Sequence, residues 1–188
     1  KNVTVSPNVV PSVTFTASPG FNTCPGTLVT YSAVPVNGGS TPSYSWRVNG
    51  FTLGAGAAFN HTPVNGDVIA VTMISSLSCV IPTSDDDSVV VVVNPTLVPA
   101  VSITTGLVGD TVCVGTTASF VPVAVNGGSA PVFSWAVNGI PVSVGGSYMF
   151  IPADGDIVTV SMTSNAVCPY PATVSRSVTM DVQPFGYP

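Results

Sequence analysis

The stretch Tyr44–Gly50 reads Tyr-Ser-Trp-Arg-Val-Asn-Gly, and 89 positions further on Phe133–Gly139 reads Phe-Ser-Trp-Ala-Val-Asn-Gly. In each copy an aromatic residue, a tryptophan and a valine alternate with small or polar residues, which is the two-residue period of a strand with one buried face. The closing Asn-Gly dipeptide tolerates the positive φ angles of a tight hairpin turn. Each stretch therefore predicts a strand that directs Trp46 or Trp135 into the core and ends in a hairpin.

The same shift of 89 positions extends in both directions from these strands. It superimposes Cys24 on Cys113 and Cys79 on Cys168, and it also aligns two Val-Asn-Gly-Gly-Ser segments at 36–40 and 125–129. So many identities at a single offset identify a tandem repeat. We expect residues 1–10 to form a strand or linker that resembles the end of a preceding repeat, with one repeat at 11–98 and a second at 99–188.

Alternation continues through each repeat and defines further inward-facing positions. These are Val29, Tyr31 and Ala33 with Ala118, Phe120 and Pro122, and Ile69, Val71 and Met73 with Val158, Val160 and Met162. About seven short strands per repeat, separated by turn residues, are typical of a sandwich. The expected fold class is all-β, with two tandem immunoglobulin-like β-sandwich domains.

Composition excludes two kinds of partner. Charged residues make up 6% of the chain, the net charge is -5, and the three basic residues are Lys1, Arg47 and Arg176. These scattered cations cannot neutralise a run of phosphates, so we expect no nucleic-acid binding. The longest apolar run, Val89–Val93, is far shorter than the ~20 residues of a membrane span, so we expect a soluble chain with no membrane insertion.

Paired prolines mark three similar segments, at Pro7 and Pro11, at Pro95 and Pro99, and at Pro184 and Pro188. Alternating apolar residues precede each pair, so that Val3 and Val5 resemble the last strand of a preceding repeat. Two explanations remain open. The chain is either cut from a longer array, or its first strand completes the sheet of a neighbouring subunit.

Val90 and Val92 are outward-facing but apolar, whereas their counterparts are Thr179 and Asp181. Together with Val3 and Val5 they form a candidate assembly strand, because an apolar strand edge invites pairing with another chain. Three aspartates lie just upstream, at 85–87, and we interpret them as charged residues that oppose such pairing. A calcium site would need six to eight oxygen ligands, and the second repeat lacks these acids, so no metal site is expected.

The four cysteines are expected to form structural disulfides, because they occupy two repeated positions in a chain of extracellular composition. Pairing within each repeat, Cys24 with Cys79 and Cys113 with Cys168, would stabilise each fold by about 4 kcal/mol in the chain-entropy model. In an immunoglobulin topology, however, those positions lie roughly 20 Å apart, at opposite ends of the sandwich. Head-to-tail stacking would instead pair Cys24 with Cys168 and leave Cys79 and Cys113 for neighbouring repeats or subunits. Both schemes remain open.

No residue pattern predicts catalysis or a cofactor. His61 is the single histidine and has Phe150 as its counterpart, the chain has no glutamate, and Asp67 and Asp156 follow turn sequences, where Asp and Asn are favoured for local hydrogen bonding. Short motifs mark Asn60 as a candidate N-glycosylation site. Ser88 and Thr111 lie in Asp-Ser/Thr-aliphatic sequences that resemble an O-glycosylation motif of some bacterial secreted proteins.

Cysteine, Val-Asn-Gly-Gly-Ser, Tyr/Phe-Ser-Trp, Val-Asn-Gly, Gly-Asp, Met-Thr/Ile-Ser and a second cysteine follow one another in both repeats. This order resembles the PKD-like or immunoglobulin-like repeats of large bacterial cell-surface proteins of the adhesin type, often exported by type IX secretion. The resemblance implies a non-enzymatic structural or adhesive extracellular module, whose partners are neighbouring repeats, copies of itself, or a surface receptor or glycan. Two alternatives are a filament subunit, assembled by strand addition or inter-subunit disulfides, and a carbohydrate-binding module.

Overall fold

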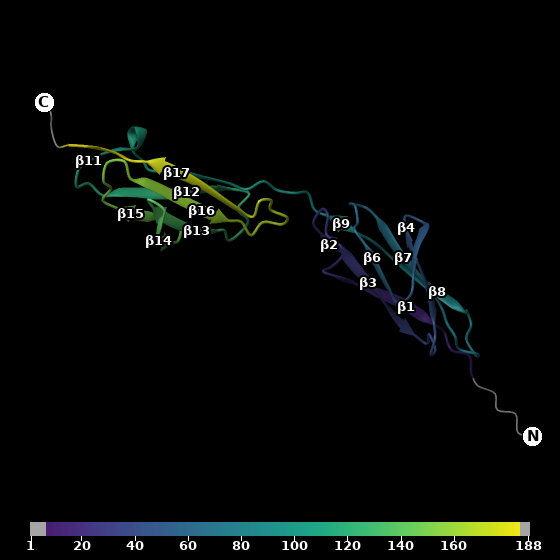
Figure 1. The fold of residues 1–188 in the computed structure, drawn as a ribbon. Helices are drawn as coiled ribbons and strands as arrows, with labels where there is room; N and C mark the ends of the chain where they lie inside the picture. Colours follow the sequence, from purple (N-terminus) through teal and green to yellow (C-terminus); the bar gives the residue numbers. More distant parts are fainter. Residues whose placement is uncertain (1–6, 185–188) are drawn as a thin grey trace, which may run out of the picture. The chain divides into compact units, whose positions relative to one another are not determined.

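The computed structural model describes residues 7–184, and its chain divides into two compact units, Lys1–Pro95 and Thr96–Pro188 (Figure 1). In the first unit the strands are β1 (Ser12–Ser18), β2 (Asn22–Thr23), β3 (Val29–Val36), β4 (Ser43–Val48), β5 (Phe51–Ala55), β6 (Ala58–His61), β7 (Val68–Ile74), β8 (Ser84–Val90) and β9 (Val92–Val93). In the second they are β10 (Ala100–Thr104), β11 (Thr111–Cys113), β12 (Ala118–Val125), β13 (Val132–Val137), β14 (Ile140–Val144), β15 (Tyr148–Phe150), β16 (Ile157–Thr163), β17 (Thr173–Thr179) and β18 (Asp181–Gln183). A 3-10 turn, Val108–Asp110, precedes β11.

Each unit is a sandwich of two antiparallel sheets. In the first unit the strand orders are β1-β3-β6 and β5-β4-β7-β8, and in the second they are β10-β12-β15 and β14-β13-β16-β17. A short parallel pair, β2 with β9 or β11 with β18, completes each unit. The two main sheets of each unit thus use seven strands, which confirms the expected fold class of tandem immunoglobulin-like sandwiches.

The alternating residues of the sequence form the core of each unit. Val29, Tyr31, Ile69, Val71 and Met73 are fully buried in the first unit. The second unit buries their counterparts Ala118, Phe120, Val158, Val160 and Met162. Because strand side chains alternate between the two faces, this one register places every second residue of β7 and β16, and of the first part of β3 and β12, between the sheets.

The Asn-Gly dipeptides form the hairpin turns that the sequence predicts. Asn49 and Gly50 have φ angles of 52° and 85°, and Asn138 and Gly139 have 53° and 79°. Two consecutive positive φ angles match the twist of the strands that the turn connects. In both units the chain therefore reverses directly from β4 into β5 or from β13 into β14.

The boundary between the units falls at Pro95, three residues before the position expected from the sequence. Leu97 belongs to the second unit because it forms a parallel bridge with Pro169. Its counterpart Val9 forms the same bridge with Val80 in the first unit. Residues 7–10 therefore belong to the first unit, although the sequence assigned them to a preceding strand or linker. Val3 and Val5 lie outside the described residues.

Candidate functional site

His61 and Asp67 form the one ion pair between described residues, with a distance of 3.1 Å from His61 Nε2 to Asp67 Oδ2. Asp67 is buried and also accepts hydrogen bonds from Asn49 Nδ2 and from the Val64 backbone N–H. Asn49 in turn accepts a hydrogen bond from the Val68 backbone. This network joins the β4–β5 turn to the start of β7, so it serves the fold.

The second unit repeats this network without a histidine. Asp156 accepts hydrogen bonds from Asn138 Nδ2 at 2.8 Å and from the Ala153 backbone N–H at 2.8 Å. Phe150 occupies the position of His61 and packs against the core, with its ring centroid 5.7 Å from that of Phe120. A catalytic pair would need the histidine, whereas the Asp-Asn contact is present in both units, which identifies Asp67 and Asp156 as structural turn residues.

Asp67 has a pKa below the ordinary value. Burial acts to raise the pKa of this carboxyl, but hydrogen bonds from Val64, Asn49 and His61, together with the charge of His61, outweigh it. A lowered pKa means that the unfolded state binds the proton more readily than the folded state. The carboxylate therefore stabilises the first unit above the ordinary aspartate range, and this stability is lost as pH falls through the lower folded pKa.

We expect Asp67→Asn to lower the free energy of unfolding of the first unit by about 2 kcal/mol at pH 7, because buried donors lose a charged acceptor. Urea titrations followed by hydrogen-exchange mass spectrometry would resolve the two units. Acidification toward pH 3 should reduce the difference between wild type and variant, since protonation removes the same charge. Asp156→Asn is the matched control and should leave the first unit unchanged. A difference that persists undiminished at pH 3 would contradict this account.

Tyr31 is a further titratable group that the sequence did not single out. Burial raises the pKa of its hydroxyl, and the negative charge of Asp67 raises it further. The hydroxyl has no hydrogen-bond partner among the described residues, and its counterpart Phe120 lacks the oxygen altogether. The hydroxyl is therefore dispensable for the repeat fold, and the ring supplies the packing.

Trp46 and Trp135 lie in the cores of their units and are 0% and 1% exposed. Trp46 Nε1 donates to the Gly56 carbonyl at 2.9 Å, and Trp135 Nε1 donates to the Gly145 carbonyl at 3.1 Å. Neither ring is available to stack on a sugar. Exposed aromatic rings are instead found at Phe51, which is 74% exposed, and at Tyr170, which is 76% exposed.

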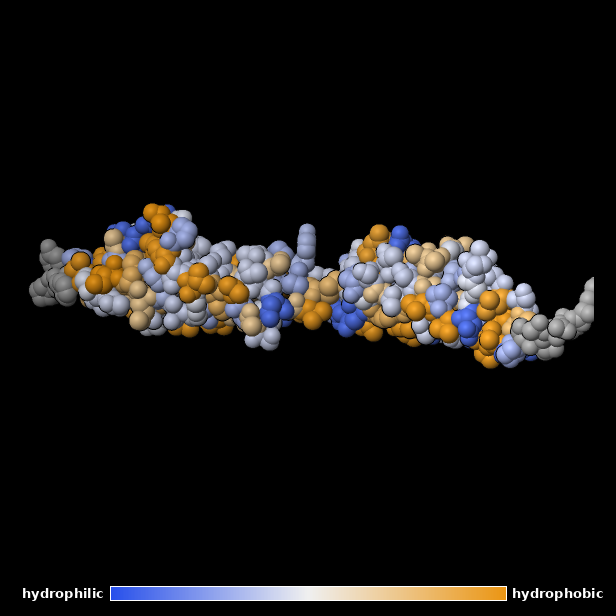
Figure 2. Space-filling view, turned by 90° about the horizontal axis from the view of Figure 1, so that it is seen from below, coloured by the Kyte–Doolittle hydropathy of each residue, from blue (hydrophilic) through white to orange (hydrophobic). Residues whose placement is uncertain are grey.

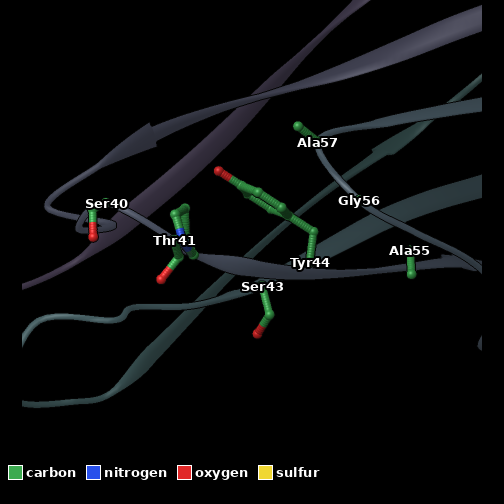
Figure 3. Close-up of a pocket in the computed structure, with 8 residues that line it drawn as sticks. Ser40, Thr41, Ser43, Tyr44, Ala55, Gly56 and Ala57 are labelled. Carbon is green, nitrogen blue, oxygen red and sulfur yellow. The ribbon is translucent and has the colours of Figure 1, made fainter.

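A hollow of about 580 Å³ lies at one edge of the first unit, lined by residues 40–44 and 55–57. Figure 3 shows the Tyr44 side chain projecting from β4 into the space between Thr41 and the Ala57 loop. No charged side chain lines this hollow. Because a specific ligand site normally combines apolar walls with several convergent polar or charged groups, the hollow does not define a ligand.

Exposed apolar side chains are distributed among polar ones, as the mixture of orange and pale residues in Figure 2 shows. Val90 and Val92, the described part of the candidate assembly strand, are 58% and 47% exposed. Val90 ends β8, an edge strand of its sheet. The acidic segment 85–87 precedes it on the same strand, and Asp85 Oδ2 accepts a hydrogen bond from the Val13 N–H at 2.8 Å.

No group of three histidine, cysteine or acidic residues within 7–184 is arranged to hold a metal ion. The glycosylation candidates lie at strand positions. Asn60 and Ser88 are exposed, whereas Thr111 is partly buried and its Oγ1 hydrogen-bonds to Asp181 at 3.2 Å. In the described part of the chain no helix is long and apolar enough to cross a membrane.

The cysteines divide into one bonded pair and two free thiols. Cys24 and Cys168 form a disulfide, while Cys79 and Cys113 are free and exposed. Pairing within each repeat is therefore wrong, and the bond found is that of the alternative scheme, Cys24 with Cys168, with Cys79 and Cys113 left unbonded in this chain. The physical reason is position, since Cys24 and Cys79 lie beside different segments of the first unit.

Backbone pairing shows where each cysteine of the first unit lies. Cys24 directly follows Thr23, which pairs with Val93 and accepts a hydrogen bond from the Asn94 N–H at 2.9 Å. Cys79 instead accepts a hydrogen bond from the Val9 N–H at 3.0 Å. Cys24 thus lies beside Val93 and Asn94, the exit segment where the chain leaves this unit. Cys79 lies beside Val9, in the entry segment where the chain begins this unit.

No family model matches the chain, and no curated protein is significantly similar in sequence. Among solved structures, one concerned with host cell surface retention of a 1.5-MDa bacterial ice-binding adhesin is 12% identical with a TM-score of 0.57, covering 95% of this chain and 66% of that chain. Three N-terminal domains of the bacteriophage RB49 outer capsid protein Hoc are 11% identical with a TM-score of 0.41, covering 92% of this chain and 59% of that chain. Fibronectin(III)-like modules of Clostridium thermocellum CbhA are 15% identical with a TM-score of 0.41, covering 92% and 94%. The likeness to the adhesin supports the fold assignment of immunoglobulin-like sandwiches in tandem.

Proposed function

We propose that this chain is a non-enzymatic structural module of a bacterial cell-surface protein, a load-bearing spacer outside the cell in which a disulfide carries tension past the folded tandem sandwiches. The observation that supports this most strongly is the disulfide between Cys24 and Cys168, which are 144 positions apart (168 − 24). Such bonds persist in oxidising, extracellular surroundings. The resemblance to PKD-like repeats of type IX-secreted adhesins also supports this role.

The disulfide has a mechanical consequence. A chain pulled from its two ends transmits tension through the Cys24–Cys168 bond, so the residues between the two cysteines carry no load while that bond is intact. Residues 1–24 and 168–188, 45 in all, can extend by at most about 160 Å at ~3.6 Å per residue. Reduction would release the whole chain, to about 680 Å at the same rise per residue.

Single-molecule pulling between the termini tests this role. We expect oxidised protein to reach about 160 Å and reduced protein about 680 Å, with the two sandwiches unfolding as separate steps after reduction. Cys24→Ser should behave like reduced protein in oxidising buffer, whereas Cys79→Ser should behave like the oxidised wild type. Full extension of the oxidised wild type in two unfolding steps would remove the main support for a load-bearing spacer.

A second candidate function is a subunit of an extracellular filament. The observation that favours it is the pair of free, exposed thiols, Cys79 beside the segment at Val9 and Cys113 beside Gln183. Two free thiols on one chain allow each molecule to bond to two others. The separate-chain comparison at the end of the next subsection tests this candidate.

A further inference from the structure

Cys79 and Cys113 occupy the same repeat positions as the two bonded cysteines. The shift of 89 positions places Cys79 on Cys168 and Cys24 on Cys113. Each unit therefore carries one cysteine of each type, and in each unit one is bonded and the other free. In the described chain, the second repeat follows the first-unit exit beside Cys24, and the first repeat precedes the second-unit entry beside Cys168. The described residues include no repeat before the entry beside Cys79 and none after the exit beside Cys113.

The backbone around free Cys79 matches that around bonded Cys168. The Val9 N–H donates to the Cys79 carbonyl at 3.0 Å, and the Ile81 N–H donates back to the Val9 carbonyl at 3.2 Å. In the second unit the Leu97 N–H donates to the Cys168 carbonyl at 2.9 Å, and the Tyr170 N–H donates to the Leu97 carbonyl at 2.8 Å. A proline lies two residues before Val9 and also before Leu97. The entry segment is thus built identically in both units.

Asparagine side chains fix these entry segments further. Asn37 Nδ2 donates to the Val10 carbonyl at 2.7 Å, and Asn126 Nδ2 donates to the Val98 carbonyl at 2.9 Å. Both asparagines have φ angles of 52°. The entry segment of the first unit is therefore held in place by its own unit, without help from a preceding repeat.

The exit segment is likewise repeated around free Cys113. In the first unit Thr23 pairs with Val93, and Asn94 continues the parallel ladder by donating to Thr23. In the second unit Val112 pairs with Val182, and Cys113 pairs with Gln183, whose carbonyl accepts a hydrogen bond from the Val114 N–H at 2.9 Å. Asn94 and Gln183 are each followed directly by a proline. Cys24 and Cys113 thus lie beside equivalent points of exit.

The segments beside Cys24 and Cys168 are joined by a very short stretch of chain. Asn94, beside Cys24, is separated from Leu97, beside Cys168, by Pro95 and Thr96 alone. Three peptide units span at most about 11 Å, so chain continuity itself brings the exit of one repeat close to the entry of the next. Wherever the same exit is followed by the same entry at this spacing, the two corresponding cysteines are within similar reach.

We propose that Cys113 forms a disulfide with Cys79 of a following copy of this two-repeat unit, so that every junction in a continuous array is stapled as Cys24–Cys168 staples this one. The inference rests on the proposed array role. Both thiols are exposed and need an oxidant, for which a small-molecule disulfide such as oxidised glutathione suffices. One thiolate displaces a glutathione thiolate to form a mixed disulfide, and the second thiolate then displaces the other, so that two protein thiols become one disulfide and two glutathione thiols are formed.

A fusion of two copies tests the proposal. Residues 1–183 of the first copy are joined to residues 7–188 of the second, so that Gln183 is followed by Pro7, Asn8 and Val9 as Asn94 is followed by Pro95, Thr96 and Leu97. After incubation with oxidised glutathione we expect two alkylatable thiols among the eight cysteines, four from each copy. Mass spectrometry should find the peptide that links Cys113 of the first copy to Cys79 of the second. Four free thiols, with both Cys24–Cys168 bonds formed, would overturn the proposal.

Moving the thiol by one residue shows whether the crosslink needs a correctly positioned cysteine or forms merely because the two copies are tethered. In the second copy, Cys79→Ser combined with Ser78→Cys keeps the linker and the number of thiols but moves the sulfur by one residue. We expect the crosslink to form at least about tenfold more slowly in this variant, because adjacent strand or turn side chains point in different directions. Equal rates would overturn the proposal. They would leave the load-bearing role standing, because pulling experiments test that role through Cys24–Cys168.

Separate chains show whether peptide continuity is required. Cys79→Ser and Cys113→Ser chains, mixed in equal amounts and oxidised, contribute one free thiol each. Random pairing gives about half heterodimer, whereas head-to-tail docking of separate molecules gives mainly heterodimer and would support the filament candidate. A heterodimer fraction near one half would exclude that candidate and show that the junction bond depends on chain continuity.

Discussion

Replacing Trp46 with alanine is expected to unfold the first unit under conditions in which the second remains folded. The Trp46 ring is fully buried, and its centroid lies 5.4 Å from that of Phe15, 5.9 Å from Phe59 and 6.3 Å from Tyr31. Truncating a buried tryptophan typically costs about 3–5 kcal/mol. The total stability of a domain of this size is about 5–15 kcal/mol, so the loss consumes much of it.

Hydrogen-exchange mass spectrometry in a urea series measures this effect, because peptides from the two units are read separately. Trp135→Ala is the equivalent substitution in the second unit and should unfold that unit first. Phe51→Ala removes an aromatic ring of which 74% is exposed, so it controls for aromatic deletion and should change stability by less than about 0.5 kcal/mol. Parallel loss of protection in both units of Trp46→Ala would contradict independent cores.

The core positions and the approximate number of strands could be predicted because they follow from local periodicity. Each inward position on β3, β7, β12 and β16 lies two positions along the chain from the next, and the repeat allows each assignment to be checked against its copy. The Asn-Gly turns were predictable for a different reason, which is that few residues tolerate positive φ. These features need no knowledge of distant contacts.

The cysteine pairing could not be decided in the same way. A disulfide depends on the distance between residues far apart in sequence, and the repeat pattern is equally compatible with pairing inside a repeat or across a junction. What decides it is the short parallel pair of β2 with β9, which places Cys24 beside the exit at Asn94. A two-residue strand carries almost no periodicity, so the sequence offered no signal for it.

The contacts of His61 were also not predictable from the sequence. His61 hydrogen-bonds to buried Asp67 and stacks on Phe59 with a centroid distance of 6.0 Å, whereas the sequence indicated no partner for this histidine. A polar side chain at a partly buried strand position is stable when a partner satisfies it. That partner lies six residues away, beyond the next turn.

Replacing Gly128 with alanine is expected to destabilise the second unit by about 3 kcal/mol, the combined effect of a left-handed backbone and overpacking. Gly128 has a φ of +85°, and an added Cβ would lie 2.5 Å from the Ala166 backbone N and 2.6 Å from the Asn165 backbone C. These backbone atoms cannot rotate away, because the Asn165 N–H donates to the Gly127 carbonyl at 3.0 Å and its side chain accepts from the Ala130 N–H at 3.0 Å. Substitution must therefore displace the loop that follows β16.

Two matched glycines separate the contributions to this loss. Gly139 has a φ of +79° with no atom within 4 Å of an added Cβ, so Gly139→Ala should cost only about 1 kcal/mol for the left-handed backbone. In the first unit, Gly39→Ala would press mainly on the Ser76 hydroxyl, with the Leu77 backbone N at 3.2 Å. Because a serine side chain can change rotamer, we expect Gly39→Ala to cost less than Gly128→Ala. Urea titrations that instead gave equal losses for Gly128→Ala and Gly139→Ala would show that backbone conformation, and not the close approach of the β16 loop, governs the glycine at this turn.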